Sequence, residues 1–264
     1  MNHLIVEILK KRRQILGLAL ADLQAKVRGS VLGIFLIVLY PIFFVAIYVG
    51  AYSYAFKATL PGLSSTGYIL YVLTGLVPFL YFSEVVGSST QIFRSHASVL
   101  KNTPVTHAVI CTVLALTALP PVIIILGAAS LLLAIKTVSL LPALLFIYST
   151  ACLVLISVSL AIITSILCAV LKDLVTAIPL LLLTLLIITP ISYSLDRVPA
   201  MIRIAALVNP ILPVIETYRS YMLNLKVVYL GLSPPMATLI MALVLTYYAG
   251  NLSRRATSRV LDLT

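Results

Sequence analysis

Long apolar runs alternate with short polar segments along most of this chain. A helix needs about 20 residues to cross a hydrocarbon core about 30 Å thick, and only a helix satisfies its own backbone there. Six runs are long enough for this. The pattern therefore predicts six membrane-spanning helices, at roughly Val31–Phe56, Tyr68–Phe93, Val105–Ile135, Leu140–Leu171, Leu174–Leu195 and Pro234–Leu252.

The first 30 residues have a different pattern. Apolar residues recur there at spacings of three, four and seven, with mostly basic and polar residues between them. This spacing predicts an amphipathic helix that lies in the cytoplasmic interface. A cleaved signal peptide is disfavoured, because the apolar stretch after Arg13 is only about seven residues long and charged residues follow it. The apolar positions of the expected helix are Leu9, Leu16, Leu20, Leu23 and Val27.

Residues 196–232 form a second exception, between the fifth and sixth runs. Two short helices are expected, at Met201–Val208 and Val214–Leu223, separated by Asn209-Pro210 and by Pro213. Each is too short and too polar to span a bilayer alone. We expect a re-entrant helical pair that dips into the outer interface.

Composition agrees with this membrane pattern. Apolar residues make up 62% of the 264 residues and charged residues only 9%, whereas soluble domains carry about a quarter charged residues. The predicted fold class is therefore all-α and integral to the membrane, with one transmembrane domain. Its parts are the interfacial helix (1–30), six spans (31–252) and a cytoplasmic tail (253–264).

The basic residues predict the orientation of the chain. If both termini are cytoplasmic, twelve of the 18 Lys and Arg residues fall on the inner side and six on the outer side. Four of the outer six lie in the long segment 196–232. The positive-inside rule thus favours placing both termini in the cytoplasm, which is consistent with an even number of spans.

Five short motifs occur in an order that resembles a known family. They are Val27–Gly33 with Pro41, Ser95–Pro104, Leu171–Leu174, Thr189–Tyr193, and Val208–Pro210 followed by Ile215–Arg219. In this order they resemble type-2 ABC exporter permeases, particularly the branch that exports O-antigen and teichoic-acid polysaccharides. The chain departs from that branch in having no Trp, and in having Val170-Leu171-Lys172 where aromatic residues and Arg are usual.

The resemblance implies a transport subunit that is not itself an enzyme. Two copies would assemble as a homodimer with two copies of a separate ABC-type ATPase, which would hold ATP and Mg²⁺. ATP hydrolysis would move a lipid-linked, O-antigen-like glycan of the lipopolysaccharide type outward across the bacterial cytoplasmic (inner) membrane. The residues agree on one point: the chain contains no GxxxxGK[ST] loop, so ATP chemistry must come from a partner.

Two other functions stay open. The same fold exports teichoic acid, capsule, drugs or lipids in other cases. A membrane-embedded transferase acting on lipid-linked substrates belongs to a different class, but it should cluster polar residues at one interface. Polar residues here are few and scattered, and no catalytic motif or metal-binding group is evident. Cys111, Cys152 and Cys168 lie within apolar runs and are expected to be core residues.

An aromatic residue recurs at every fourth position along the first span. A step of four drifts only about 40° per repeat, so the set forms one slowly winding stripe about 24 Å long. Such a stripe suits the CH faces of sugar rings, whereas ordinary helix packing is the alternative. Glu84, the one acidic residue well inside an apolar run, either lines this pathway or is a hydrated interfacial acid. The proposed pathway residues are Tyr40, Phe44, Tyr48, Tyr52, Phe56 and Glu84.

The resemblance also assigns two further regions. The polar segment after the second span is expected to be a coupling helix that contacts the ATPase, a plain basic loop being the alternative. Lys172 and Asp173 are a second candidate contact, unless they satisfy each other or the adjacent helix ends. The coupling candidates are His96, Ser98, Leu100, Lys101, Asn102, Thr103, Lys172 and Asp173.

The outer segment is expected to form a gate, with a capping element that has no gating role as the alternative. Glu216 and Arg219 stand three residues apart on one helix face and are expected to pair. The gate residues are Asn209, Pro210, Glu216 and Arg219.

Overall fold

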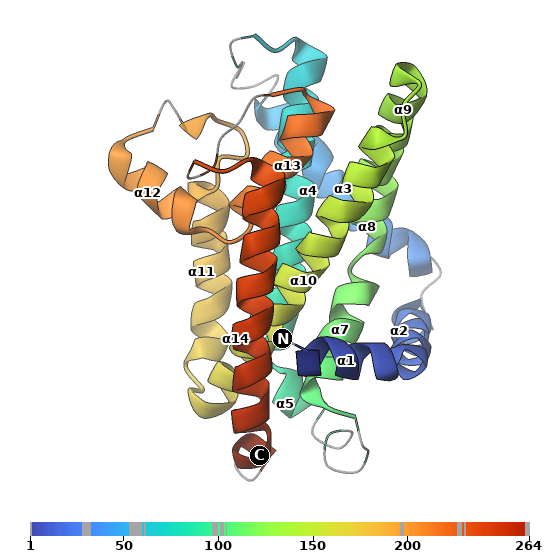
Figure 1. Ribbon diagram of the computed structural model, residues 1–264, viewed down its shortest axis with the longest axis vertical. Coiled ribbons are helices and arrows are strands. Elements are labelled where there is room, and N and C mark those ends of the chain that lie inside the picture. The colour runs from blue at the N-terminus through green and yellow to red at the C-terminus, as the bar shows by residue number, and fades with distance from the viewer. Residues whose placement is uncertain are drawn as a thin grey trace.

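A computed structural model describes residues 2–27, 33–52, 60, 62–96, 100, 103, 105–195, 198–225, 229 and 231–261. The described residues are overwhelmingly helical, and their only β pairing is an isolated bridge between Tyr229 and Leu232. The all-α fold class is thus confirmed. Most of the long helices run roughly along the long axis of the molecule (Figure 1).

Within the described residues, four helices are long and apolar enough to cross a membrane. They are α4 (Ser65–Ser89), the combined segment His107–Thr137, α10 (Leu141–Val170) and α14 (Pro234–Leu261, with its apolar part at Pro234–Arg255). A bent pair, α12 (Ala200–Val208) and α13 (Leu212–Met222), would count as a fifth. Two shorter apolar helices, α3 (Gly33–Gly50) and α11 (Leu174–Ile188), coincide with the first and fifth predicted spans.

The His107–Thr137 segment is continuous but irregular. It comprises α7 (His107–Thr117), α8 (Pro120–Val122), the π-helical turn η2 (Ile123–Gly127) and α9 (Ala128–Thr137). Pro120 and Pro121 supply no backbone N–H, so α7 ends just before them and the helix restarts with proline in its first turn. At its far end Val138 adopts a left-handed conformation (φ 48°) and reverses the chain toward α10.

Helix α11 is shorter than the predicted span Leu174–Leu195, so that prediction was wrong in extent. Thr189 precedes Pro190, and a residue before proline is driven out of the α region. Thr189 accordingly has φ −68° and ψ 129°, and the helix stops at Ile188. Residues 189–193 then run as irregular chain.

Helix α10 is the centre of the bundle and packs against α4, α7, α13 and α14. Its buried face is rich in small hydroxyl residues, which let neighbouring helices approach closely. Ser149 and Ser159 donate to the carbonyls of Leu145 and Leu155 in their own helix, at 2.6 and 2.7 Å. Their hydroxyls therefore need no water inside an apolar core.

The N-terminal segment forms two helices, α1 (Asn2–Lys10) and α2 (Arg12–Val27), where a single helix was predicted. Both contact α7 and lie across the lower part of the bundle (Figure 1). In α2, Ile15 and Ala19 are buried, whereas Leu16 and Leu20 of the predicted apolar set are exposed. Helix α5 (Ile92–Ser95), the α10–α11 junction and the C-terminus lie at the same end of the molecule.

Candidate functional site

Residues 200–222 form two short helices, as predicted, with a sharp bend between α12 and α13. The two helix axes meet at 94°, and the break falls at Asn209-Pro210. Pro213 does not interrupt the chain, because it occupies the first turn of α13, where the missing N–H has no helical partner in any case. Helix α12 is largely exposed, while α13 is buried against α4, α10 and α14.

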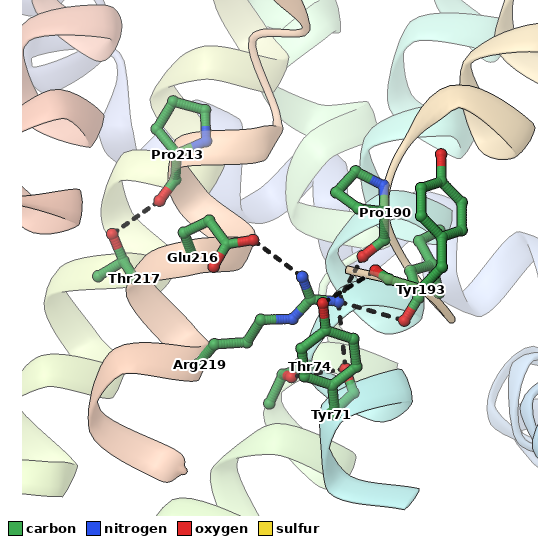
Figure 2. A network of polar contacts seen from close by, with 9 residues as sticks. Tyr71, Thr74, Pro190, Tyr193, Pro213, Glu216, Thr217 and Arg219 are labelled. Carbon is green, nitrogen blue, oxygen red and sulfur yellow. Dashed lines mark hydrogen bonds and ion pairs between the residues drawn. The ribbon is translucent and has the colours of Figure 1, made fainter. Parts of the chain in front are cut away.

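Arg219 of α13 is fully buried, with no exposed surface. Its Nη1 donates to the Glu216 carboxylate at 2.9 Å, which confirms the predicted pair. Its Nη2 donates to the carbonyls of Pro190 and Ile191 at 2.7 and 3.2 Å (Figure 2). A buried charge is costly unless it is paired and hydrogen-bonded, and this one is both.

The guanidinium also lies over an aromatic ring. Its carbon is 3.5 Å from the centroid of the Tyr71 ring on α4, in cation–π geometry (Figure 2). Gly75, one helical turn further along α4, makes room for it: a Cβ there would lie 2.9 Å from Nη2 of Arg219. Sequence reasoning missed both residues. The signal available was a glycine in the middle of an otherwise bulky span.

Three tyrosines bind the irregular segment 189–193 from the opposite side. Tyr68 and Tyr71 of α4 donate to the carbonyls of Ser192 and Tyr193 at 3.1 and 3.0 Å. Tyr48 of α3 donates to the Ser192 hydroxyl at 3.4 Å. A segment without helical hydrogen bonds thereby finds donors inside the bundle, as buried carbonyls require.

Asn209 completes the arrangement. Its side-chain amide donates to the Thr189 hydroxyl at 2.7 Å, and its carbonyl oxygen accepts from the backbone N–H of Ile211 at 3.2 Å. Two motifs that stand about 20 residues apart in sequence, at Thr189–Tyr193 and Asn209–Arg219, therefore meet at one place. We call Arg219, Glu216, Tyr71, Pro190 and Ile191 the Arg219 cluster.

The aromatic stripe of α3 is partly assembled. The rings of Phe44 and Tyr48 are stacked with centroids 6.4 Å apart, and those of Tyr48 and Tyr52 with centroids 4.6 Å apart. Tyr40 is 72% exposed and lines a separate cavity together with Glu84. Phe56 lies outside the described residues.

The predicted coupling segment is described only in part. His96 interacts with the Ser95 hydroxyl at 2.8 Å, Leu100 is buried and Thr103 is exposed. Ser98, Lys101 and Asn102 lie outside the described residues. Lys172 and Asp173 are exposed where α10 gives way to α11, at the end of the molecule that also carries α5 (Figure 1).

The Glu7 carboxylate of α1 binds to residues at the same end of the molecule as α5. Glu7 accepts hydrogen bonds from Thr106, just before α7, at 2.8 Å and from Lys11 at 3.4 Å. The next residue, His107, is buried and lies against the ring of Phe93, with centroids 5.6 Å apart. The N-terminal helices therefore contact the start of α7, directly beyond the predicted coupling segment.

The apolar spanning helices, joined by buried polar contacts, define a multi-pass membrane protein. The sequence profile of the ABC-2 type transporter family matches residues 13–223, which is 211 of the 264 residues. The chain thus belongs to the ABC-2 type transporter family and is a membrane permease of an ABC transporter. A search of curated proteins finds no significant match to it.

Proposed function

We propose that this chain is the permease subunit of an exporter that moves a lipid-linked, O-antigen-like polysaccharide outward across the bacterial cytoplasmic membrane. In this proposal α3 and α11 are the first and fifth of six spans, and both termini are cytoplasmic. A second copy of the chain completes the pathway, and two copies of a separate ATPase supply the energy. Family membership supports the transporter class, and the aromatic stripe supports the cargo.

The stacked rings of Phe44, Tyr48 and Tyr52 are the observation that carries the cargo proposal. They form a continuous aromatic surface without charge along α3. Aromatic faces offer apolar contact to the CH faces of sugars and hold no single ring tightly, which suits a polymer that must slide. Tyr40 continues this pathway toward the inner end of α3, and Glu84 lies beside that inner end.

The stripe is tested by changing all three residues, Phe44, Tyr48 and Tyr52, to Ala. We expect surface polysaccharide to fall severalfold while the protein still assembles with its ATPase. Tyr48→Phe distinguishes the ring of Tyr48, which belongs to the stripe, from its hydroxyl, because the variant keeps the ring and removes the hydrogen bond to Ser192. A matched control changes Tyr247 and Tyr248 of α14, an exposed aromatic pair with centroids 5.8 Å apart. Normal export by a well-expressed triple variant would refute the stripe as the pathway.

The ATPase partner is tested by purifying the tagged chain in mild detergent, identifying the co-purified proteins and assaying ATP hydrolysis. An ABC-type ATPase should accompany the chain, and substitutions within residues 98–104 should release it. If the chain purifies alone in several detergents, the transferase alternative becomes the one to test.

The outer gate is proposed at α12 and α13, with Asn209, Pro210, Glu216 and Arg219 as its fixed side. The Arg219 cluster supports this role because it joins α13 to both α4 and the end of α11. Because of this connection, α13, α4 and the end of α11 would move as one rigid unit if the gate opens.

A further inference from the structure

A cavity of about 560 Å³ lies between α3, α4 and the α7–α8 region, and none of the Arg219 cluster lines it. Exposed side chains at its rim are Tyr40, Glu84 and Ser88, and buried residues at its floor include Val77 and Val122. Its volume falls within the range of about 300–1,000 Å³ that is typical of small-molecule sites. The cavity is therefore large enough to hold a ligand.

The described wall of the cavity carries a single charge, the Glu84 carboxylate. No Lys, Arg or His is among the residues that line it. Glu84 accepts a hydrogen bond from Ser88 at 3.3 Å. An acidic residue in a membrane-spanning helix normally faces a partner or a hydrated cavity. None of the described lining residues supplies a cation, so the carboxylate is open to water or to a cationic ligand.

Two tyrosines from different helices line the cavity with Glu84. Tyr40 belongs to α3, and Tyr81 stands three residues before Glu84 on α4. The Tyr81 hydroxyl already donates to the carbonyl of Ala115 at 3.0 Å, so this residue offers its ring rather than its hydroxyl. A carboxylate combined with aromatic faces is a combination that binds ammonium groups. A phosphate or carboxylate would be repelled and would find no cation in the wall.

The position of the cavity fits an amphiphile. Glu84 lies five residues before the end of α4 at Ser89, which corresponds to about 7.5 Å along the helix axis. The polar part of the cavity is thus close to one membrane surface. The remaining wall is mostly apolar, with Leu80, Leu114 and Pro121 among its residues, and is suited to a hydrocarbon chain.

We propose that this cavity binds amphiphiles whose head group carries an ammonium group with N–H donors, which the trimethylammonium group of phosphatidylcholine lacks. Glu84 would accept hydrogen bonds from that group, and Tyr40 would cover it. The site lies beside the inner end of the proposed pathway, but its chemistry and its test do not depend on which cargo is exported.

The absence of Trp from the sequence makes a direct test possible. Tyr40→Trp introduces a single fluorophore at the rim of the cavity and keeps an aromatic face there. The full chain is placed in phosphatidylcholine vesicles and titrated with dibrominated stearylamine, whose bromine atoms quench Trp fluorescence. Dibrominated stearyl alcohol has the same chain without the charge. We expect saturable quenching by the amine, at least about tenfold stronger in apparent affinity than by the alcohol.

Three further proteins make the result specific. When Glu84→Gln is combined with Tyr40→Trp, the preference for the brominated amine over the alcohol should disappear. When Asp173→Asn, at an exposed position, is combined with Tyr40→Trp, that preference should stay unchanged. A reporter at Tyr248→Trp, on the exposed face of α14, should show equal quenching by both probes. Thermal unfolding of each protein checks that the fold is intact. The proposal is overturned if amine and alcohol quench Tyr40→Trp equally, or if a folded Glu84→Gln protein keeps the preference.

The same assay identifies the source of the ammonium group. If unlabelled phosphatidylethanolamine displaces the brominated amine, the site takes a lipid of the bilayer. If only free amines displace it, the site takes a soluble cationic amphiphile. Displacement by phosphatidylglycerol, which lacks an amine, would contradict the proposal.

Discussion

Arg219 illustrates how one residue can connect three elements of a membrane protein. Its guanidinium pairs within α13 with Glu216, its Nη2 donates to carbonyls of residues 190 and 191 just beyond α11, and its face covers a ring of α4. Where water is excluded, each of these contacts is stronger than it would be at a surface. Removing the Glu216 carboxylate would leave a buried charge uncompensated, which typically costs about 3–5 kcal/mol.

Gly75 gives the sharpest prediction at the scale of the residue. A methyl group there would lie 2.9 Å from Nη2 of Arg219 and 3.3 Å from Cα of Ile191. We expect Gly75→Ala to displace the guanidinium and to destabilise the protein by about 1–3 kcal/mol, as overpacking does. The measurement is thermal unfolding in detergent with a thiol-reactive dye, since the three cysteines are buried in the fold.

Gly87→Ala is the matched control, because it lies on the same helix. Its added Cβ would meet only Leu182 Cδ1, at 3.7 Å, which is an ordinary contact. Replacing glycine by alanine in a helix is otherwise favourable by about 1 kcal/mol. A Gly75→Ala protein as stable as Gly87→Ala would show that the close approach to Arg219 is not required.

At the scale of the element, the helices with regular sequence patterns could be predicted closely. The span predicted at Leu140–Leu171 is α10 at Leu141–Val170, because the apolar run is unbroken and its one proline, Pro142, lies in the first helical turn, where proline is tolerated. The interior of the third span, with its π-helical turn, could not be predicted. Its geometry depends on packing, as at Gly127, whose added Cβ would meet the Phe146 ring at 3.3 Å.

The candidate site was predictable only within single helices. The Glu216–Arg219 pair follows from a spacing of three on one helix, which sequence displays directly. The contact between Arg219 and Tyr71 joins residues 148 positions apart, and no local pattern encodes it. Helices α3, α4 and α11 must pack before the tyrosines and residues 189–193 come together.

Helix α1 supports a prediction of its own. Thr106 donates to Glu7 at 2.8 Å, and a hydrogen bond to a charged group is worth about 1.5–3 kcal/mol. Thr106→Val keeps the shape of the side chain and removes this bond together with the N-cap contact that the Thr106 hydroxyl makes with the N–H of Val109, so α1 should separate from α7 more often. We expect trypsin to cleave at residues 10–13 about tenfold faster in the detergent-solubilised chain.

Thr176→Val is the comparison for that experiment, since its hydroxyl bonds only within the exposed start of α11. It should leave the rate of cleavage unchanged. Equal rates for all three proteins would mean that the Thr106–Glu7 bond does not hold α1 in place.

At the scale of the whole molecule, the two ends differ in character. One end carries the N-terminal helices, α5, the α10–α11 junction and the C-terminus, and the other carries the end of α9 and the start of α4 (Figure 1). Basic residues concentrate at the first of these ends. The positive-inside rule therefore predicts that this end is cytoplasmic, in agreement with the proposed orientation.

This orientation is tested with two single cysteines in a protein whose native cysteines are changed to Ser. Lys136→Cys lies at the end of α9 and Lys172→Cys at the α10–α11 junction, and both positions are exposed. In sealed vesicles of native orientation, a membrane-impermeant maleimide should label residue 136 and reach residue 172 only after detergent is added. Labelling of both before detergent, or of residue 172 alone, would contradict cytoplasmic termini.

The irregular segment at residues 189–193 is held mainly through its backbone. Arg219, Tyr68 and Tyr71 all donate to main-chain carbonyls there. Every amino acid supplies such a carbonyl, so these bonds do not depend on which side chain stands at the acceptor position. A substitution at an acceptor position keeps the carbonyl, whereas a substitution of Arg219, Tyr68 or Tyr71 removes the donor. The tolerance of the protein to mutation is in this way distributed unevenly between the two sides of the same contact.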